Sequence, residues 1–332
     1  MLKSYNITII VPIYNVGKYI ARCAESLFAQ TLYDIEYIFV NDCTPDNSIE
    51  ILNEAIANHP NRKGDIKIIS HKVNKGLAAS RNAGLSEATG EYIFHCDSDD
   101  WVAIDFCEKM YNKAKETDAD IVWSDYFEDR LNGQFCIMQK FEEDSTKCIK
   151  LMLSTSMKWN LWNKIFKRSL FIEEGVKFIN GCNLGEDLAT IKMFYYAKKV
   201  AYLPQAFYHY NTINTSSYTS PQIMQSKQNE SFANIESLET FFRETKDYAV
   251  VEPYIHYLKI WTKIRIISGN TDKILLRKFC NMYPESNNYM ATTPHLSNKA
   301  KYLLYLANKK YINLIIVYNS LAKLLRKFKI YK

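Results

Sequence analysis

The sequence predicts an α/β fold in which a mainly parallel sheet carries helices on both faces, followed by a helical C-terminal region. Two observations predict it. Over the first 125 residues, short β-branched or apolar runs alternate with amphipathic stretches, and polar residues gather directly after those runs. Ligands of such a sheet bind outside the carboxyl ends of its strands. Functional residues are therefore expected at these strand ends.

The elements of this fold are expected in the following order. Strands are predicted at residues 7–11, 35–41, 66–70, 91–95 and 121–123, with helices between them at 17–29, 48–58, 77–88 and 105–116. After Asp125 the alternation is interrupted by a polar excursion through Gly133 and an aromatic-rich block at 159–171. A helix is expected at 186–197 and a strand at 200–210. From Pro221 onward the pattern is helical, with a break near 284–294.

Composition and charge limit the classes of function. The 332 residues are 47% hydrophobic and 23% charged, which is typical of a globular protein. The net charge of +6 belongs to the tail, because residues 299–332 hold nine Lys or Arg and no Asp or Glu, so that the first 298 residues sum to 33 minus 36, or −3. A nucleic-acid-binding body would need a basic face on the folded domain. No nucleic-acid partner is therefore expected.

The first two strand ends carry candidate donor-binding residues. Pro12 has no N–H for a ladder, so it is expected to end the first strand and turn the backbone outward, as a binding element or as a simple turn. Asp42 follows the second strand, where its carboxylate can accept hydrogen bonds from a base N–H or a ribose hydroxyl. Asp46, Asn47 and Ser48 are expected to be turn and N-cap residues of the next helix.

The third strand end leads into a helix through Asn74, Lys75 and Gly76. Gly76 relieves the loop before the helix, and helix N-termini favour anions. Lys75 could reach a phosphate or be a solvated surface lysine. Arg81 could bind a donor or be the internal ion-pair partner of a carboxylate cluster.

That carboxylate cluster is the strongest signal. Asp97, Ser98, Asp99 and Asp100 follow one another directly after the fourth strand. Alternate side chains of an extended segment face the same side, so Asp97 and Asp99 can converge on one point. Like charges held together need a cation, and hard oxygen ligands favour Mg²⁺ or Mn²⁺. The alternative is a solvated acidic turn.

Several of these segments resemble a known family. VPIYN at residue 11, VND at 40, NKGLAASRN at 74 and DSDD at 97 are similar, in order and spacing, to the nucleotide-sugar domain of family 2 glycosyltransferases, which have the GT-A fold. WNLWNKIFKRSL at 159 resembles the W-N-K-L-Y block of the bacterial polysaccharide branch, and GED at 185 resembles its G-E-D segment. The chain departs from the family where N-V-G at residue 15 replaces N-x-E.

The resemblance implies a domain organisation and a reaction. Residues 1–218 are expected to form the transferase domain, with a nucleotide-sugar half at 1–105 and an acceptor half at 106–218, and 219–332 a helical region. The implied reaction is an inverting, metal-assisted single displacement that moves a hexose or N-acetylhexosamine from a nucleotide sugar, with UDP expected, to a hydroxyl of a growing surface glycan.

The resemblance also implies roles for the residues. Asp187 is the candidate general base, with Glu186 as the alternate, although acidic residues also favour the first turn of a helix without any catalytic role. Asp97, Asp99 and the more distant His209 would hold Mn²⁺ or Mg²⁺, although a lone histidine between tyrosines is more often structural.

The acceptor is expected at Asp100, Trp101, Trp162 and Lys164, unless the two tryptophans belong to the hydrophobic core. Donor binding is assigned to Pro12, Tyr14, Asn15, Asp42, Asn74, Lys75, Gly76, Arg81, Asp97 and Ser98.

The basic amphipathic tail at 299–332 predicts where the enzyme works. None of its apolar runs reaches the roughly 18–20 residues that a membrane span requires. Lysine and arginine beside apolar residues indicate a helix lying on an anionic membrane surface; the alternative is a helix packed on the body. With no signal-peptide pattern and eight cysteines without metal-ligand spacing, a cytoplasmic protein on the inner face of the membrane, acting on a lipid-linked glycan, is expected.

Other classes of protein fit the sequence less well. A dinucleotide-dependent oxidoreductase would need GxGxxG after the first strand, and the chain has only ten glycines and no such motif. A P-loop protein would need glycine where Pro12 stands. A nucleotidyltransferase or a non-catalytic sugar-nucleotide-binding protein remains the alternative.

Overall fold

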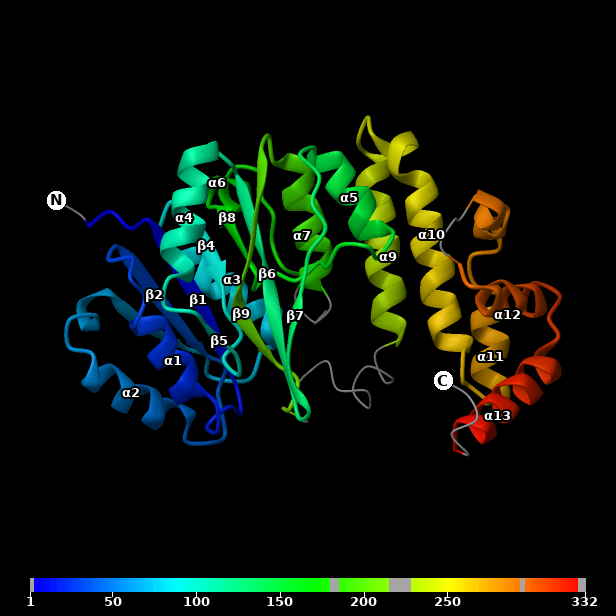
Figure 1. Ribbon diagram of the computed structural model, residues 1–332, viewed down its shortest axis with the longest axis horizontal. Helices are drawn as coiled ribbons and strands as arrows, with labels where there is room; N and C mark the ends of the chain where they lie inside the picture. Colours follow the sequence, from blue (N-terminus) through cyan, green and yellow to red (C-terminus); the bar gives the residue numbers. More distant parts are fainter. Residues whose placement is uncertain (1–2, 180–184, 215–227, 293–295, 328–332) are drawn as a thin grey trace. The chain divides into compact units, whose positions relative to one another are not determined.

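The computed structural model describes residues 3–179, 185–214, 228–292 and 296–327 and divides the chain into two compact units (Figure 1). The first unit comprises Met1–Met152 and Ser156–Ile223, and the second comprises Leu153–Thr155 and Met224–Lys332. All of the strands described below belong to the first unit.

A single mixed sheet organises the first unit. Within the described residues its strand order is β3-β2-β1-β4-β8-β6-β9-β5, with β7 paired to β6. The pairs β3–β2, β2–β1 and β1–β4 are parallel, and so is β6–β9, whereas β8, β7 and β5 pair antiparallel with their neighbours. The strands are β1 (Ile7–Ile13), β2 (Ile35–Asn41), β3 (Ile66–Ser70), β4 (Tyr92–His95), β5 (Trp101–Val102), β6 (Ile121–Arg130), β7 (Gly133–Ile137), β8 (Lys164–Lys167) and β9 (Val200–Asn211).

Helices follow the strands, as predicted, and they cover both faces of the sheet. They are α1 (Ile20–Phe28), α2 (Ser48–Asn58), α3 (Leu77–Glu87), α4 (Phe106–Thr117), α5 (Ser145–Leu153), α6 (Ser169–Ile172) and α7 (Gly185–Tyr196), with a short 3-10 turn, η1 (Lys63–Asp65), before β3. The predicted α/β fold with a mainly parallel sheet and helices on both faces is therefore confirmed.

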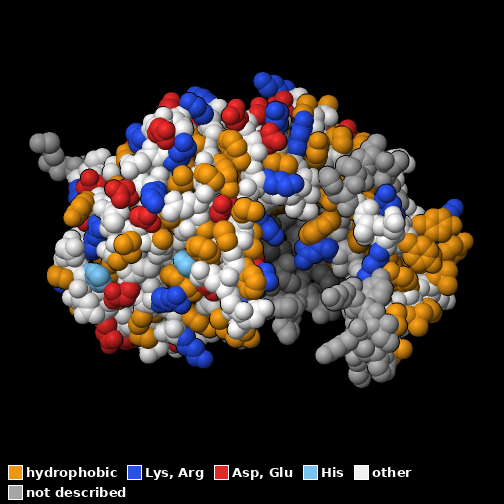
Figure 2. Space-filling view, in the orientation of Figure 1, with side chains coloured by type: hydrophobic (Ala, Val, Ile, Leu, Met, Phe, Trp, Pro, Cys, Tyr) orange, Lys and Arg blue, Asp and Glu red, His pale blue; other side chains and the backbone are white. Residues whose placement is uncertain are grey.

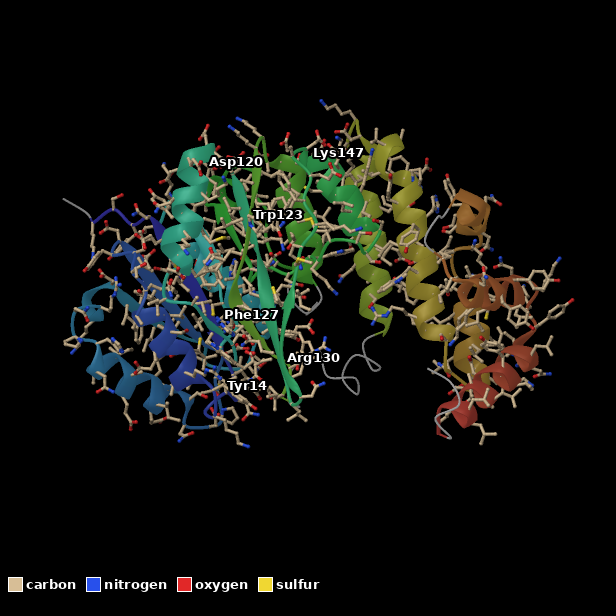
Figure 3. The ribbon with its side chains drawn as sticks, viewed as in Figure 1. Tyr14, Asp120, Trp123, Phe127, Arg130 and Lys147 are labelled. Atoms are coloured by element: carbon tan, nitrogen blue, oxygen red, sulfur yellow. The ribbon has the colours of Figure 1, made fainter. Side chains whose placement is uncertain are left out.

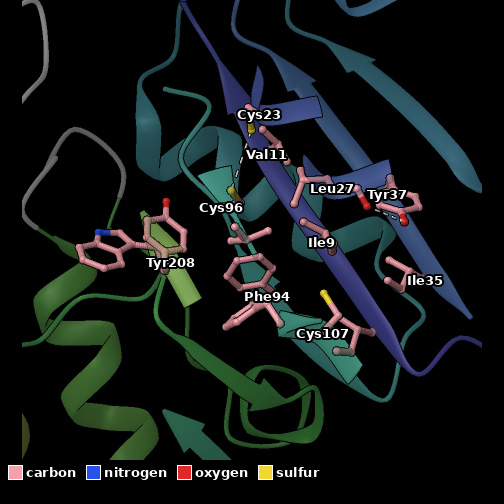
Figure 4. Packing of buried hydrophobic residues seen from close by; sticks show 14 of the residues in the cluster. Ile9, Val11, Cys23, Leu27, Ile35, Tyr37, Phe94, Cys96, Cys107 and Tyr208 are labelled. Atoms are coloured by element: carbon pink, nitrogen blue, oxygen red, sulfur yellow. Dashed lines mark hydrogen bonds between the residues drawn. The ribbon is translucent and has the colours of Figure 1, made fainter. Parts of the chain in front are cut away.

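The alternation of side chains along β1 explains the two covered faces. All seven residues of β1 are buried, as expected for a strand inside a parallel sheet. Ile9 and Val11 pack in the same cluster as Cys23 and Leu27 of α1 (Figure 4). Ile10 points to the opposite face, where α3 approaches so closely that a Cβ built on Gly84 would lie 2.4 Å from Ile10 Cγ2.

Pro12 lies inside β1, so the prediction that it ends the strand is wrong. β1 pairs with β4 only as far as Ile10, but its pairing with β2 continues to Ile13, whose carbonyl accepts a hydrogen bond from the Asp42 N–H. Ile13 thus faces β2, and successive residues of a strand direct their backbone groups to opposite sides. The ring nitrogen of Pro12 therefore faces the β4 side. It lies beyond the last residue that pairs with β4, so no hydrogen bond of the sheet is lost.

The polar segment and the aromatic block that interrupt the predicted alternation both contribute strands to the sheet. The strand predicted at 121–123 is β6, and it continues to Arg130. The chain then turns at Gly133, whose φ of +130° favours glycine, and forms a hairpin with β7. Figure 3 shows Trp123, Phe127 and Arg130 along β6. The aromatic block contributes β8, which is inserted antiparallel between β4 and β6.

The second unit is helical within the described residues. Its elements are α9 (Gln228–Arg243), α10 (Tyr248–Ile267), α11 (Lys273–Cys280), the 3-10 segment η2 (Pro284–Thr292), α12 (Asn298–Asn308) and α13 (Ile312–Lys327). A cluster that includes Phe232, Ile267, Phe279, Leu303 and Ile315 forms its core. In the part of the chain that is described, no helix combines the length and apolar character needed to cross a membrane.

The close approach of α3 to β1 predicts a cost for any side chain at residue 84. We expect Gly84→Val to lower the free energy of unfolding by roughly 1–3 kcal/mol, because the added methyl groups must displace Ile10 in a packed core. Chemical denaturation measures this loss. Gly64→Val is the matched control, since nothing lies within 4 Å of a Cβ at Gly64; equal losses in both variants would contradict the packing argument.

Candidate active site

The acidic turn lies between β4, which ends at His95, and β5, which begins at Trp101. A backbone hydrogen bond from the Asp100 N–H to the Asp97 carbonyl, 3.1 Å long, closes the turn. Because β4 is parallel to β1, the turn lies at the carboxyl end of the parallel strands. That is the edge where such sheets bind ligands.

Strand β9 holds the acidic turn through Asp100. One Asp100 carboxylate oxygen accepts a 2.6 Å hydrogen bond from the Tyr208 hydroxyl, and the other accepts a 2.7 Å bond from the Asn211 N–H. The Tyr208 oxygen in turn accepts a bond from the Asp97 N–H. Asp100 is only 1% exposed. It faces inward, so the expectation that it meets the acceptor is corrected: both of its oxygens fasten the turn to β9.

Burial changes the pKa of Asp100. Burial, and after it the charges of Asp99 and Asp97, raise the pKa of the Asp100 carboxyl well above its usual range. The bonds from Asn211 and Tyr208 act in the opposite direction. Asp100 is therefore held by hydrogen bonds rather than by an ion pair.

Asp97 forms the ion pair that the sequence left open for Arg81. The Arg81 Nη2 donates a 2.9 Å hydrogen bond to Asp97 Oδ1. The Arg81 side chain is 2% exposed and that of Asp97 is 27% exposed. The arginine thus lies beneath the turn, and Asp97 keeps one face toward solvent. Ser98, between the two candidate metal ligands, is buried.

Asp99 is the carboxylate whose charge is least compensated. Its Oδ2 accepts a 2.7 Å hydrogen bond from Asn214 Nδ2. Burial and then the neighbouring charge of Asp97 raise the pKa of Asp99 to about 6. Two oxygen-donor side chains at alternate positions, held close despite their repulsion, match the ligand chemistry of Mg²⁺ and Mn²⁺. The residues present therefore fit a divalent cation.

His209 does not join these two carboxylates, and the expectation that it is a third metal ligand is corrected. Among the described residues, no group of three or more His, Cys, Asp or Glu side chains is placed to hold a metal ion. His209 stacks on Trp101 at 5.0 Å and on Phe127 at 4.8 Å between ring centroids. Its Nδ1 lies 3.3 Å from Asp129 Oδ2, and burial lowers the pKa of its imidazole.

Asp42 organises the loop between β3 and α3. Its Oδ1 accepts a 2.8 Å hydrogen bond from the Lys75 N–H and its Oδ2 accepts one of the same length from the Gly76 N–H. His71 Nδ1 lies 2.7 Å from Oδ1. Asp42 is 3% exposed. The loop N–H groups that could have met a phosphate are thus bound to Asp42, and the side chains of Asn74 and Lys75 are exposed.

The first strand end presents Tyr14 and Asn15. Tyr14 is 49% exposed, and Figure 3 shows it near the end of the sheet toward which β6 runs. Asn15 has a φ of 55°, and its N–H donates a 2.8 Å bond to the hydroxyl of Thr44. Asp46 accepts bonds from the N–H groups of Gly17 and Ser48, so its predicted role in the turn is confirmed.

Two of the expected acceptor residues lie in the interior and are corrected. Trp162 is 6% exposed and stacks on Tyr208 at 4.5 Å and Tyr210 at 5.2 Å, so its ring is packed against β9. Lys164 is fully buried, and its Nζ donates to the carbonyls of Lys158 and Asn160 and to the side-chain oxygen of Asn163. These bonds close the loop before β8. Trp101 is partly buried between His209 and the guanidinium of Arg22.

For the two candidate bases, the structure describes the helix to which they belong but not their side chains. Glu186 and Asp187 belong to the first turn of α7. Their side chains lie outside the described residues. The segment before α7 is anchored at Phe178, because Asn82 of α3 donates to the Phe178 carbonyl at 2.8 Å and accepts from its N–H at 3.0 Å.

Residues at the end of β9 and just after it were not singled out from the sequence. Tyr208, Asn211 and Asn214 supply the hydrogen bonds that hold Asp97, Asp99 and Asp100. They lie more than 100 positions from the acidic turn, and no local spacing links the two segments. The only available signal was the polar end of a strand otherwise rich in aromatic residues.

The chain is similar to known glycosyltransferases. The model of the family described as "Glycosyl transferase family 2" matches residues 8–180, slightly more than half of the chain. The chain is 32% identical over 212 residues to the uncharacterized glycosyltransferase EpsJ of Bacillus subtilis (strain 168). That match covers 61% of this chain and 60% of the length of the relative.

Solved structures show the same fold. S. aureus TarS 1–349 in complex with UDP-GlcNAc has a TM-score of 0.59 and 18% identity, covering 92% of this chain and 91% of that one. The mannosyltransferase PcManGT from Pyrobaculum calidifontis, solved with GDP-Man and Mn²⁺, has a TM-score of 0.55 and 14% identity, covering 97% of this chain and 88% of that one. The predicted GT-A fold is therefore confirmed.

The raised pKa of Asp99 predicts how stability depends on pH in the absence of divalent cations. The folded protein holds the Asp99 proton up to about pH 6, whereas the ordinary value is 3.8. Because the folded state binds this proton more tightly, stability should fall by roughly 1–3 kcal/mol as the pH rises from about 4 to about 7. Denaturation in EDTA across this range measures the loss.

Asp99→Asn is the matched variant for that measurement, because it keeps an acceptor for Asn214 and removes the titrating group. Its stability should change less between pH 4 and pH 7, and addition of Mn²⁺ should stabilise the wild type at pH 7 but not the variant. The same pH dependence in both proteins would contradict the assignment.

Proposed function

We propose that this chain, which belongs to glycosyl transferase family 2, transfers a hexose or N-acetylhexosamine from a UDP-linked donor to a hydroxyl of a growing surface glycan. One observation carries the proposal. The acidic turn presents Asp97 and Asp99 at the carboxyl edge of the parallel strands, and β9 fixes it there through Asp100. The UDP-GlcNAc bound by TarS supports the choice of nucleotide.

Asp97 and Asp99 would hold Mn²⁺ or Mg²⁺ in this enzyme, and the Mn²⁺ in PcManGT supports that choice. When bound, the ion would supply Lewis-acid stabilisation of the departing diphosphate. Arg81 supports the site from below: its buried guanidinium binds one Asp97 oxygen and orients the other. Asn214 orients Asp99 in the same way. These two contacts preorganise the carboxylates before the donor arrives.

The transfer also needs a base. In a single displacement, the acceptor oxygen forms a bond to the anomeric carbon while the bond to the diphosphate oxygen breaks, which inverts the configuration. The hydroxyl proton passes to a carboxylate within hydrogen-bond reach. We assign this role to Asp187, with Glu186 as the alternate, since both begin α7. The Asn82–Phe178 pair anchors the approach to that helix.

The proposed place of action is the cytoplasmic face of the membrane, where a lipid-linked glycan would be the acceptor. The nine basic residues and the lack of acidic ones at 299–332 support it, because such a segment is attracted to anionic lipid. The proposed chemistry of the donor site does not depend on this location.

A panel of UDP- and GDP-sugars with Mn²⁺ tests the proposed reaction, scored for metal-dependent transfer or hydrolysis. We expect turnover with a UDP-sugar, and we expect Asp99→Ala to abolish it. Asp118→Asn is the control, because Asp118 is exposed and its left-handed φ of 50° also suits asparagine. If Asp99→Ala retains full turnover, or if no sugar nucleotide is turned over, the proposal fails.

A second pair of variants identifies the base. Asp187→Asn should lower kcat by about 10²–10⁴-fold with little change in the donor KM, because the proton acceptor is lost and donor binding is kept. Glu186→Gln should remain close to the wild type. The reverse result assigns the base to Glu186, and full activity in both variants would refute a carboxylate base on α7.

A further inference from the structure

The C-terminal unit contains a basic hollow with a volume of about 480 Å³. Lys273 and Arg277 of α11 line it, together with Lys310 and the start of α13. Lys273 and Arg277 are four residues apart and so lie on one face of α11. These three cationic side chains are exposed, and no carboxylate is found among the described residues that line the hollow. Its surface is therefore suited to an anion.

The acidic residue next to these cations is engaged elsewhere. Asp272 caps α11, and its Oδ1 accepts hydrogen bonds from the N–H groups of Ile274 at 2.8 Å and Leu275 at 3.1 Å. An N-cap carboxylate is directed at the backbone of its own helix. Asp272 is thus occupied by its own helix, and among the described residues the positive charge of the hollow remains available to a ligand.

An apolar stripe runs along α13 from the edge of this hollow. Its members share a spacing of three or four residues and are each between 47% and 54% exposed; they are Tyr311, Leu314, Val317, Leu321 and Leu324. This spacing places them on one side of the helix. Ile312 and Ile315 face the core of the unit instead. The stripe is therefore not the packing face of α13.

The hollow and the stripe form one continuous surface, because Tyr311 and Leu314 belong to both. On the neighbouring helix, Tyr302 and Tyr305 are also about half exposed. Figure 2 shows hydrophobic side chains gathered over α12 on the face in view. We call the basic hollow and the apolar stripe together the α13 surface.

We propose that the α13 surface docks on a bilayer of anionic phospholipid, with the stripe at the acyl boundary and Lys273, Arg277 and Lys310 around a lipid phosphate. The proposal rests on the membrane location given under the proposed function and names the surface responsible for it. Charge complementarity favours this occupant, because residues 299–332 carry nine basic residues and no acidic one. A free phosphate would match the hollow but not the stripe, whereas a bilayer matches both.

Vesicle co-sedimentation of the full chain tests the proposal. We expect binding to vesicles of phosphatidylcholine that contain phosphatidylglycerol, and binding at least tenfold weaker to phosphatidylcholine alone. Replacing Lys273, Arg277 and Lys310 together by alanine should weaken binding to the anionic vesicles about tenfold or more. The reason is that each basic residue near an anionic membrane adds to the free energy of binding. Alanine at the exposed Lys63, Lys140 and Lys177 removes the same charge from the first unit and is the control.

The apolar part is tested separately with Leu314→Ser, Val317→Ser and Leu321→Ser, which alter exposed side chains. This triple variant should also bind anionic vesicles at least tenfold more weakly while keeping the wild-type melting temperature. Equal losses in the lysine control, equal binding to both kinds of vesicle, or vesicle binding unchanged in both surface variants would overturn the proposal. So would a stripe variant whose only change is loss of self-association, measured by sedimentation velocity.

Inorganic phosphate distinguishes the sources of the anion. A rise in the melting temperature in phosphate over chloride at matched ionic strength, lost when Lys273, Arg277 and Lys310 are replaced by alanine and found together with no binding to anionic vesicles, would make the hollow a free-phosphate site and overturn the lipid assignment. Turnover of a soluble sugar nucleotide is measured in the same variants. Vesicle binding without turnover of any donor would refute the proposed reaction alone, and turnover without vesicle binding would refute the α13 surface alone.

Discussion

The contact between Asp100 and β9 is the constraint on which the rest of the site depends. Asp100 is buried and carries two hydrogen bonds from β9, one from the Tyr208 hydroxyl and one from the Asn211 N–H. A buried carboxylate without such donors would be costly. Its position thus couples β9 to the acidic turn, and the directions of Asp97 and Asp99 follow from it.

The turn concentrates three carboxylates around a single described ion pair, that of Asp97 with Arg81. Asp100 is satisfied by hydrogen bonds, whereas Asp99 keeps a charge that burial and Asp97 both disfavour. This imbalance is what a divalent cation would relieve.

Several residues that the sequence suggested as ligand-binding residues pack inside the protein and support the site. Trp162 stacks on Tyr208, the residue that binds the acidic turn, and Lys164 closes the loop before β8 through backbone carbonyls. His209 contributes a ring stack rather than a metal ligand. Aromatic and basic side chains suit a sugar site and a protein interior equally well, so residue type alone could not distinguish the two.

The sequence by itself determined the strand–helix alternation, the bounds of β2, β3 and α2, and the placing of Asp42 and the four-residue acidic turn at strand ends. These features depend on local periodicity, in which each residue reports its own burial. Only the tertiary structure decided that Pro12 continues β1, that Asp100 faces inward and that Asp42 binds the loop at Gly76. Those outcomes depend on strand pairing and on contacts between segments as far apart as Asp100 and Asn211, which no local pattern records.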